Sequence, residues 1–193
     1  MTIATQTFEK LSDSELVWRA QFDAVDFAPL YLRYRDRVLR YCLYRLGDMA
    51  EAEDAASAVF MKALAGLDGY RDGAAFTPWL FRIAHNEVVD CHKRRFRRPE
   101  TTLSFAGDLA DPLPSPEDEA VTSDSLRRLR ALLGTLPPRE RAIMELRLTD
   151  LTTSEIAAVL AISEANVRTA QSRALVRLRD AMDVHSDPVR SNG

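Results

Sequence analysis

Two runs of apolar residues at helical spacing, within residues 152–179, form the clearest pattern in the chain. Thr152 and Glu155 precede the first run with the spacing of a capping box, in which each side chain bonds the backbone N–H of the other residue. Residues 161–162 interrupt the pattern, and Ser163 is placed to cap a second helix. The pattern therefore predicts two short helices joined by a tight turn.

The second of these helices has two faces of different character. At about 100° per residue, one face is mostly apolar and the other carries arginines and hydroxyls. Arginine can pair with guanine through two hydrogen bonds, and hydroxyls can reach bases or phosphates, so the polar face suits a DNA major groove. An ordinary helical hairpin with a solvated face is the alternative. The inner set is Val167, Ala170, Gln171, Ala174 and Leu178, and the outer set is Arg168, Thr169, Ser172, Arg173 and Val176.

Helical spacing continues through most of the chain, whereas strand signals are scarce. Ser12 and Glu15 form another capping box before an apolar stretch. Thr77 is placed to cap a helix that has Pro78 at its first position. We therefore expect an all-α fold. The further helices are expected at residues 27–46, 50–67, 78–95, 125–136 and 139–148.

An acidic stretch with four prolines, residues 99–124, separates two helical halves. Prolines and polar residues without helical spacing are typical of a flexible linker. We therefore predict two small helical domains, at residues 12–98 and 125–182, joined by this linker. Residues 1–11 and 183–193 are expected to form a disordered N-terminus and a disordered tail.

The 193-residue chain has a net charge of −3, which is unexpected for a protein that binds DNA. The distribution of charge changes this picture. Residues 80–98 hold six basic and two acidic side chains, and residues 126–179 hold ten arginines and five acids. Residues 99–125 hold seven acids and no basic side chain. Two basic blocks thus flank an acidic segment, which would oppose contacts to DNA phosphates.

Composition places the chain among ordinary globular proteins, with 46% hydrophobic and 28% charged residues. No apolar run reaches the roughly 18 residues that a membrane-spanning helix needs. The N-terminal residues lack the basic start and apolar core of a signal peptide. We therefore expect a cytoplasmic protein without membrane insertion.

A basic stretch that carries aromatic residues, FTPWLFRIAHNEVVDCHKRRFRR, spans residues 76–98. Such a helix beside a glycine-containing loop can follow a single nucleic-acid strand, with phosphates on the basic side chains and bases stacked or held in pockets. The alternative is that Phe76, Trp79 and Phe81 belong to the core and that the arginines form a solvated helix end, and for Trp79 we favour the core.

Residues for catalysis or metal binding are sparse. His85, Cys91 and His92 share one expected helix but have neither CxxC nor HExxH spacing, and Cys42 lies in an apolar pattern. The sequence contains no phosphate-binding glycine motif, and no His-Asp pair can be assigned to activate a nucleophilic cysteine. We therefore expect no enzymatic activity, no metal site and no cofactor.

Five blocks in order carry a family resemblance: SDSELVWRAQ, FAPLYLRYRDRVLRYCLYRLGD, AEDAASAVFMKAL, FTPWLFRIAHNEVVDCHKRR, and LPPRERAIMELRLTDLTTSEIAAVLAISEANVRTAQSRALVRLR. From about Ser12 to Met182 the chain resembles an extracytoplasmic-function (ECF) sigma factor of bacterial RNA polymerase. The resemblance implies a region 2-like domain and a region 4-like helix-turn-helix domain. It further implies a transcription factor that binds core polymerase, recognises and melts promoters, and initiates transcription of a specific regulon.

The resemblance also implies roles for individual residues. Core polymerase would be bound by Asp54, Ser57, Ala58 and Phe60, although the family usually has Gln and Glu where this chain has Ser57 and Ala58. The minus-thirty-five element would be read by Arg168, Thr169, Ser172 and Arg173, and the minus-ten element by Tyr70, Arg71, Asn86, Lys93, Arg94 and Arg95.

Two positions of the helix-turn-helix depart from the family pattern. Gln171 stands where an apolar residue is common, and Ala161 replaces a frequent turn glycine. The second change costs little if the turn avoids positive φ. The implied partners are core RNA polymerase, through the coiled coil of its largest subunit and its flap, promoter DNA, and an anti-sigma factor of the kind typical in this family.

A stand-alone helix-turn-helix repressor, or the output domain of a response regulator, is the rival function. It explains the C-terminal half but leaves residues 76–98 and the acidic linker without a role. For the linker we hypothesise an extended path through a positively lined channel of core polymerase, which would also hinder DNA binding by the free protein. A solvated tether is the alternative. The acids concerned are Asp108, Asp111, Glu117, Asp118 and Glu119.

Overall fold

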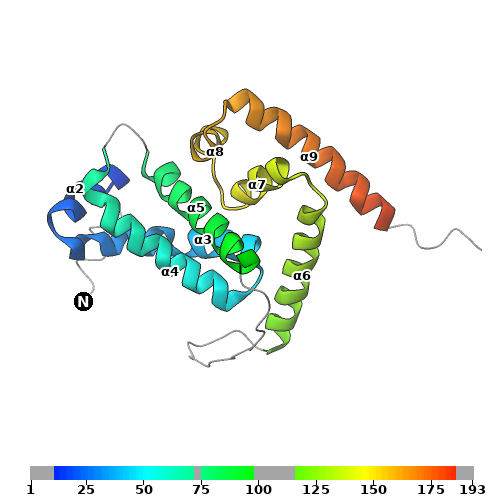
Figure 1. Ribbon diagram of the computed structural model, residues 1–193, viewed down its shortest axis with the longest axis horizontal. Helices are drawn as coiled ribbons and strands as arrows, with labels where there is room; N and C mark the ends of the chain where they lie inside the picture. The colour runs from blue at the N-terminus through cyan, green and yellow to red at the C-terminus, as the bar shows by residue number, and fades with distance from the viewer. Residues whose placement is uncertain (1–10, 72–74, 98–115, 186–193) are drawn as a thin grey trace, which may run out of the picture.

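The computed structural model describes residues 11–71, 75–97 and 116–185, and every regular element in these ranges is helical (Figure 1). The predicted all-α fold is therefore confirmed. The α-helices are α2 (Asp13–Phe22), α3 (Ala28–Leu46), α4 (Met49–Gly66), α5 (Phe76–Arg97), α6 (Pro116–Gly134), α7 (Pro138–Arg147), α8 (Thr153–Leu160) and α9 (Glu164–His185), and short 3-10 turns η1 (Ala24–Phe27) and η2 (Leu67–Gly69) complete the set.

Helices α2 to α5 pack into one bundle, in which α3 contacts α4 and α5. Burying an aliphatic or aromatic side chain contributes about 1.5–3 kcal/mol, and α3 places its large apolar side chains three to four residues apart on one face. This spacing follows the amphipathic pattern predicted for residues 27–46. The buried side chains of α3 are Leu30, Tyr34, Val38, Tyr41, Cys42 and Leu46.

Gly47 ends α3 in a left-handed conformation with φ of 81°. Arg130 from α6 lies against this glycine and donates hydrogen bonds to the carbonyls of Tyr44, at 3.2 Å, and Leu46, at 3.1 Å. A Cβ at position 47 would lie 1.5 Å from Nη1 of Arg130. Glycine is therefore required here both for the backbone conformation and for the approach of the arginine that satisfies the helix end.

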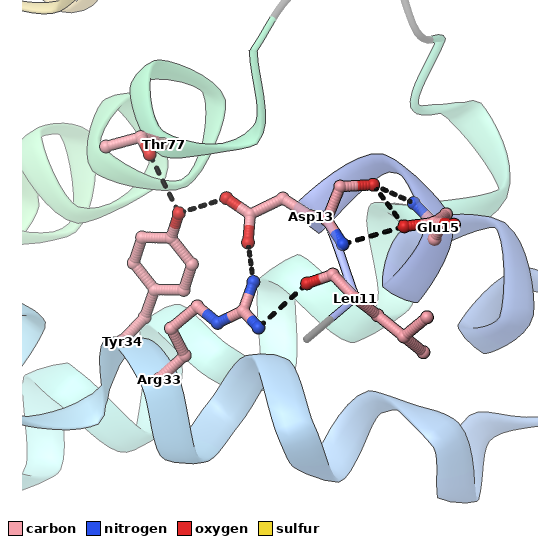
Figure 2. Close-up of polar contacts among 7 residues, drawn as sticks. Leu11, Asp13, Glu15, Arg33, Tyr34 and Thr77 are labelled. Atoms are coloured by element: carbon pink, nitrogen blue, oxygen red, sulfur yellow. Dashed lines mark hydrogen bonds and ion pairs between the residues drawn. The ribbon is translucent and has the colours of Figure 1, made fainter. Parts of the chain in front are cut away.

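A polar network fixes the starts of α2 and α5 against α3 (Figure 2). The Tyr34 hydroxyl is bonded to the Asp13 carboxylate and lies 2.8 Å from the Thr77 hydroxyl, while Arg33 Nη1 donates to Asp13 at 2.5 Å.

The expectation that Thr77 caps a helix is wrong. Helix α5 begins at Phe76, and the buried Thr77 side chain bonds Tyr34 across the bundle instead. Burial raises the pKa of Tyr34, and its hydrogen bond to Asp13 adds to the shift.

Helices α6 to α9 form the C-terminal unit, in which α9 packs on α6, α7 and α8. The expected capping boxes are present: Thr152 and Glu155 begin α8, and Ser12 and Glu15 begin α2. The Ser163 hydroxyl accepts from the Asn166 backbone N–H at 3.2 Å, as expected for the cap of α9.

Several predicted boundaries differ from the structure. Helix α6 begins at Pro116 rather than at Ser125, so the end of the predicted linker is helical. Proline fits the first turn of a helix because its missing N–H has no partner there in any case. Helix α9 continues to His185, into the predicted tail. The remainder of that tail, residues 1–10 of the predicted disordered N-terminus, and residues 98–115 lie outside the described residues.

The two helical units touch along a surface that we call the joint. In the joint, α3 and α5 face α7 and α8, and one hydrophobic cluster continues from one unit into the other. Polar contacts also cross the joint. Arg37 Nε donates to the Thr149 carbonyl at 3.1 Å, and Arg45 forms an ion pair with Glu145 at 2.7 Å. Arg40 lies 3.5 Å from Asp150, and Arg130 of α6 caps the end of α3.

Candidate nucleic-acid interface

The predicted outer face of α9 is open to solvent. Arg168, Thr169, Ser172 and Arg173 are all exposed, whereas Val167 and Ala174 on the inner face are 0% exposed. Arg168 forms an ion pair with Glu164 one turn earlier, at 3.0 Å, and its side chain remains 62% exposed. An exposed salt bridge of this kind costs little to break, so Arg168 remains available to another anion.

The turn between α8 and α9 adopts a conformation that the sequence does not suggest. Ala161 has a φ of 52°, in the left-handed region, so the condition under which alanine costs little at this position is not met. The N–H groups of Ala161 and Ile162 bond the carbonyl of Ala157, which satisfies the end of α8. The cost of the left-handed alanine, about 1 kcal/mol, is offset by these bonds.

Gln171 is explained by Arg147, a residue that the sequence pattern did not single out. Arg147 of α7 donates to the Gln171 amide oxygen at 3.2 Å, to the Thr153 hydroxyl at 2.8 Å and to the Leu151 carbonyl at 2.8 Å. One guanidinium thereby connects α7, α8 and α9. The polar residue on the inner face of α9 is the only signal that the sequence carries for this contact.

The basic end of α5 is exposed but held by acids. Lys93 pairs with Asp90 at 3.2 Å, Arg95 approaches Glu51 at 3.8 Å, and Arg94 pairs with Glu87 at 2.9 Å. Asn86 on the same helix is exposed as well. These four side chains therefore share one helix whose cations have local partners that DNA phosphates would have to replace.

Glu87 is the centre of a second contact that the sequence did not predict. Its side chain is only 2% exposed and bonds both Lys62 of α4 and Arg94. Burial alone would raise the pKa of Glu87, but the hydrogen bonds from the two cations outweigh burial, and the net shift is downward. The carboxylate stays ionised and orients Arg94 at the surface.

Tyr70 does not lie where a residue that stacks on a base would be expected. Its ring is 7% exposed and makes edge contacts with Trp79, at 5.1 Å between centroids, and with Phe76, at 6.0 Å. Arg71 is exposed beside it, and residues 72–74, which contain the glycine of the loop before α5, lie outside the described residues. Phe76 and Phe81 are buried and Trp79 is partly buried, so the core interpretation of these aromatics is correct.

The residues assigned to polymerase binding divide into surface and core. Asp54 and Ser57 on α4 are exposed and Ala58 is half-buried. Phe60 is 7% exposed, with its ring 4.9 Å from that of Tyr31 and 6.5 Å from that of Phe27. The ring of Phe60 fills the core between α3 and α4, which favours the alternative that Phe60 is a core residue, and its assignment to polymerase binding stays a prediction.

An apolar surface at the N-terminal end was missed by the sequence analysis. Trp18, Phe22 and Val25 are 61%, 77% and 76% exposed, and the two aromatic rings lie 5.0 Å apart.

Within the described ranges, no helix has the length and apolar character to cross a bilayer, and no group of three or more His, Cys, Asp or Glu side chains is placed to hold a metal ion.

Comparisons with known proteins agree with this two-unit arrangement. Residues 30–98 match the family model of Sigma-70 region 2, and residues 126–178 match that of Sigma-70, region 4. The ECF RNA polymerase sigma factor BldN of Streptomyces coelicolor is 37% identical over 164 residues, which cover 83% of this chain and 62% of that relative. The ECF RNA polymerase sigma factor SigD of Mycobacterium tuberculosis is 33% identical over 159 residues, with 79% and 75% covered.

Solved structures show the same fold. The structure of CnrH in complex with the cytosolic domain of CnrY aligns with a TM-score of 0.72 at 24% identity, over 89% of this chain and 97% of that chain. The sigma factor RpoE of Bartonella quintana, in complex with the anti-sigma factor NepR, aligns with a TM-score of 0.62 at 21% identity, over 82% and 98%. From the two matched regions, in this order, and the identity to SigD, the chain belongs to the ECF RNA polymerase sigma factors.

Proposed function

We propose that this sigma factor reads the minus-thirty-five element of its promoters with the outer face of α9. The observation that carries this proposal is the division of α9, in which the two arginines and two hydroxyl residues are exposed while Val167 and Ala174 are completely buried. With its inner face anchored, the helix can enter a major groove as a rigid element. Arg168 and Arg173 would bond guanine edges, and Thr169 and Ser172 would bond bases or phosphates.

The minus-ten element would meet α5 and the preceding loop. Asn86 would contact an extruded base, and Lys93, Arg94, Arg95 and Arg71 would bind phosphates of the separated strand. Extruding a base costs a few kcal/mol, and its capture shifts the duplex toward the melted state by only the difference in affinity for the two states. Tyr70 would act by shaping the wall beneath this surface, since its ring is packed against Phe76 and Trp79.

Core polymerase would dock on α4. Asp54 and Ser57 supply an exposed polar strip beside the half-buried Ala58, and Phe60 supports the strip from inside. A helix of this character suits docking against the coiled coil of the largest polymerase subunit. The C-terminal unit would contact the flap, and an anti-sigma factor is part of the proposal because RpoE of Bartonella quintana was solved with one.

Promoter binding would require the joint to open. Elements named for positions minus ten and minus thirty-five lie about 25 base pairs apart, or about 85 Å at about 3.4 Å per base pair. A compact chain of this length has a radius of gyration of about 16 Å, far too small to reach both elements. We infer that docking on core polymerase separates the two units.

The path of the acidic segment is a further part of the proposal. Asp108 and Asp111 lie outside the described residues, and Glu117, Asp118 and Glu119 belong to α6, so an extended path applies at most to residues 98–115. This segment would follow a basic channel of core polymerase. Replacement of Asp108 and Asp111 by Asn should then change the yield of short abortive transcripts, whereas a solvated tether would leave that yield unaltered.

The decisive experiment is co-purification with bacterial core polymerase, followed by run-off transcription from a matched promoter. A sigma factor should bind core and direct initiation only as part of the holoenzyme. A stand-alone repressor would instead bind duplex DNA tightly without polymerase and would not co-purify with core. Specific duplex binding by the free protein, together with no core binding, would contradict the proposed function.

A further inference from the structure

A cavity of about 740 Å³ lies at the joint between the two helical units. Its walls come from α3, α5, the end of α6 and its connection to α7, α7 itself, and the end of α8 with the turn after it. This volume is within the range of small-molecule sites, which commonly occur where two units of a protein meet. The side chains that matter for its chemistry are Arg45, His85, His92, Arg139 and Arg141, together with the apolar Leu136, Ala142, Leu160 and Ile162.

Positive charge in this cavity exceeds negative charge. Arg45 and Arg141 both donate to the Glu145 carboxylate, at 2.7 and 2.8 Å, and that side chain is 0% exposed. Arg139, also in the wall, forms no ion pair with any residue that the structure describes. Two guanidinium groups therefore share one carboxylate, and the third, on Arg139, adds its charge to the wall, which leaves an electropositive site.

Arg45 also carries an unused hydrogen-bond donor. Its Nε is buried and has no hydrogen-bond partner among the described residues. An unsatisfied buried donor costs about 1–3 kcal/mol, more when it is charged, so an acceptor that reached it would gain that energy on binding. The arginine that carries this donor lies in the wall of a cavity with excess positive charge, which favours an anionic oxygen there.

Burial and nearby positive charge lower the pKa values of both cavity histidines. Burial lowers the pKa of His85, and Arg45 lowers it further; burial also lowers the pKa of His92, with Arg45 and Arg141 adding to the shift against the opposing effect of Glu145. Both imidazoles are therefore neutral near pH 7. His85 Nδ1 lies 2.9 Å from the Tyr41 hydroxyl, which orients its ring.

The apolar part of the cavity wall favours a ligand that also has an apolar portion. Leu136 and Ala142 are buried, and Leu160 and Ile162 are half-buried. These side chains can cover a ring or an aliphatic portion of a ligand, while guanidinium groups match the oxygens of a phosphoryl group. A simple monovalent ion would use only part of this site.

We propose that the joint cavity binds a phosphate-bearing small molecule, with its phosphoryl oxygens on Arg45, Arg139 and Arg141 and the rest of the molecule against the aliphatic wall. Because the walls belong to both helical units, the bound molecule stabilises the packed arrangement by its difference in affinity for the packed and separated states. The proposal concerns the isolated chain and does not depend on the proposed contacts to promoter or polymerase.

The test uses the full chain with two probes, inorganic pyrophosphate and adenosine diphosphate. The chain has three histidines, and His185, the last residue of α9, lies about 30 Å along that helix from the turn that contributes Ile162 to the cavity. Proton–carbon NMR of the imidazole groups should show saturable shifts of His85 and His92, with His185 as an internal reference. The pKa values of both cavity histidines should rise when the anion is bound, because it offsets the field of the arginines.

Two variants that each remove one positive charge complete the design. Arg139→Gln should weaken binding of both probes by about tenfold or more, while Arg128→Gln, on an exposed stretch of α6, should bind as the wild type does. Tighter binding of adenosine diphosphate identifies a nucleotide-like ligand, and equal binding identifies an inorganic polyphosphate. Absence of shifts at His85 and His92 with both probes, or equal weakening in the two variants, would overturn the proposal. Shifts of His85 and His92 on addition of an acidic peptide, with neither probe binding, would also overturn it in favour of a protein partner.

Discussion

Arg45 of α3 donates to Glu145 of α7 at 2.7 Å and thereby joins the two helical units through a carboxylate that is completely buried. Arg141 bonds the other oxygen of the same carboxylate at 2.8 Å. Removing one partner of a buried ion pair leaves an uncompensated charge, whereas an exposed pair contributes little. This difference allows the joint to be tested by two isosteric substitutions.

Glu145→Gln should lower the free energy of unfolding by about 3 kcal/mol, because Arg45 and Arg141 lose their common anion. Asp150→Asn is the matched control, since Asp150 is 77% exposed and pairs with Arg40 at 3.5 Å, and it should cost less than about 1 kcal/mol. Urea unfolding of both variants measures the difference. Equal, small effects would mean that the Glu145 pair does not hold the joint in solution.

Arg168→Ala and Arg173→Ala should each weaken promoter binding by the holoenzyme by about 1–3 kcal/mol, the range for loss of a two-bond arginine–guanine contact. The loss should be confined to promoters with the matching minus-thirty-five sequence. Run-off transcription gives the readout, and Arg128→Ala provides an exposed arginine outside α9 as control. A folded double variant with wild-type transcription would remove α9 from promoter recognition.

Phe60→Ala should lower the free energy of unfolding by about 3–5 kcal/mol, because the ring fills the core against Phe27 and Tyr31. Met61→Ala on the same helix is the control, since that side chain is 73% exposed and should change stability by less than about 1 kcal/mol. Circular dichroism during thermal unfolding distinguishes the two. A stable Phe60→Ala protein that fails to bind core polymerase would restore the surface role.

Asp54→Lys should abolish co-purification with core polymerase while helix content stays unchanged, because Asp54 is exposed on α4. Asp36→Lys makes the same charge change on α3, where the side chain is 78% exposed, and should bind core normally. Pull-down at two salt concentrations separates a specific contact from a general effect of net charge. Wild-type binding by a folded Asp54→Lys protein would exclude this residue from the docking surface.

Gly47→Ala should destabilise the protein by more than about 1 kcal/mol, since the position has positive φ and the new Cβ would meet the Arg130 guanidinium. The substitution should also displace Arg130 from the end of α3. Gly69→Ala, whose Cβ would meet no atom within 4 Å, is the control and should be close to neutral. Chemical denaturation measures both, and a neutral Gly47→Ala would contradict the described approach of Arg130.

Local patterns predicted the features that depend on neighbours in the sequence. The capping box of Thr152 and Glu155 acts within a single turn, so the spacing of the two residues is sufficient to identify it. The start of α6 was placed too late because proline was interpreted as a linker signal, although Pro116 occupies a first helical turn, where proline is tolerated. Thr77 fits a local cap equally well, and only the position of Tyr34 made the other partner available.

The sequence by itself determined where most of the helices lie and which face of α9 is polar, because both follow from the period of the helix. Only the tertiary structure decided that Phe60 is buried, that Gln171 meets Arg147, and that Arg45 reaches Glu145, 100 positions away. A contact over that separation depends on which helices pack together and at what angle. The spacing of residues along the chain determines neither of these. The joint and its cavity therefore emerge only when the two units are seen together.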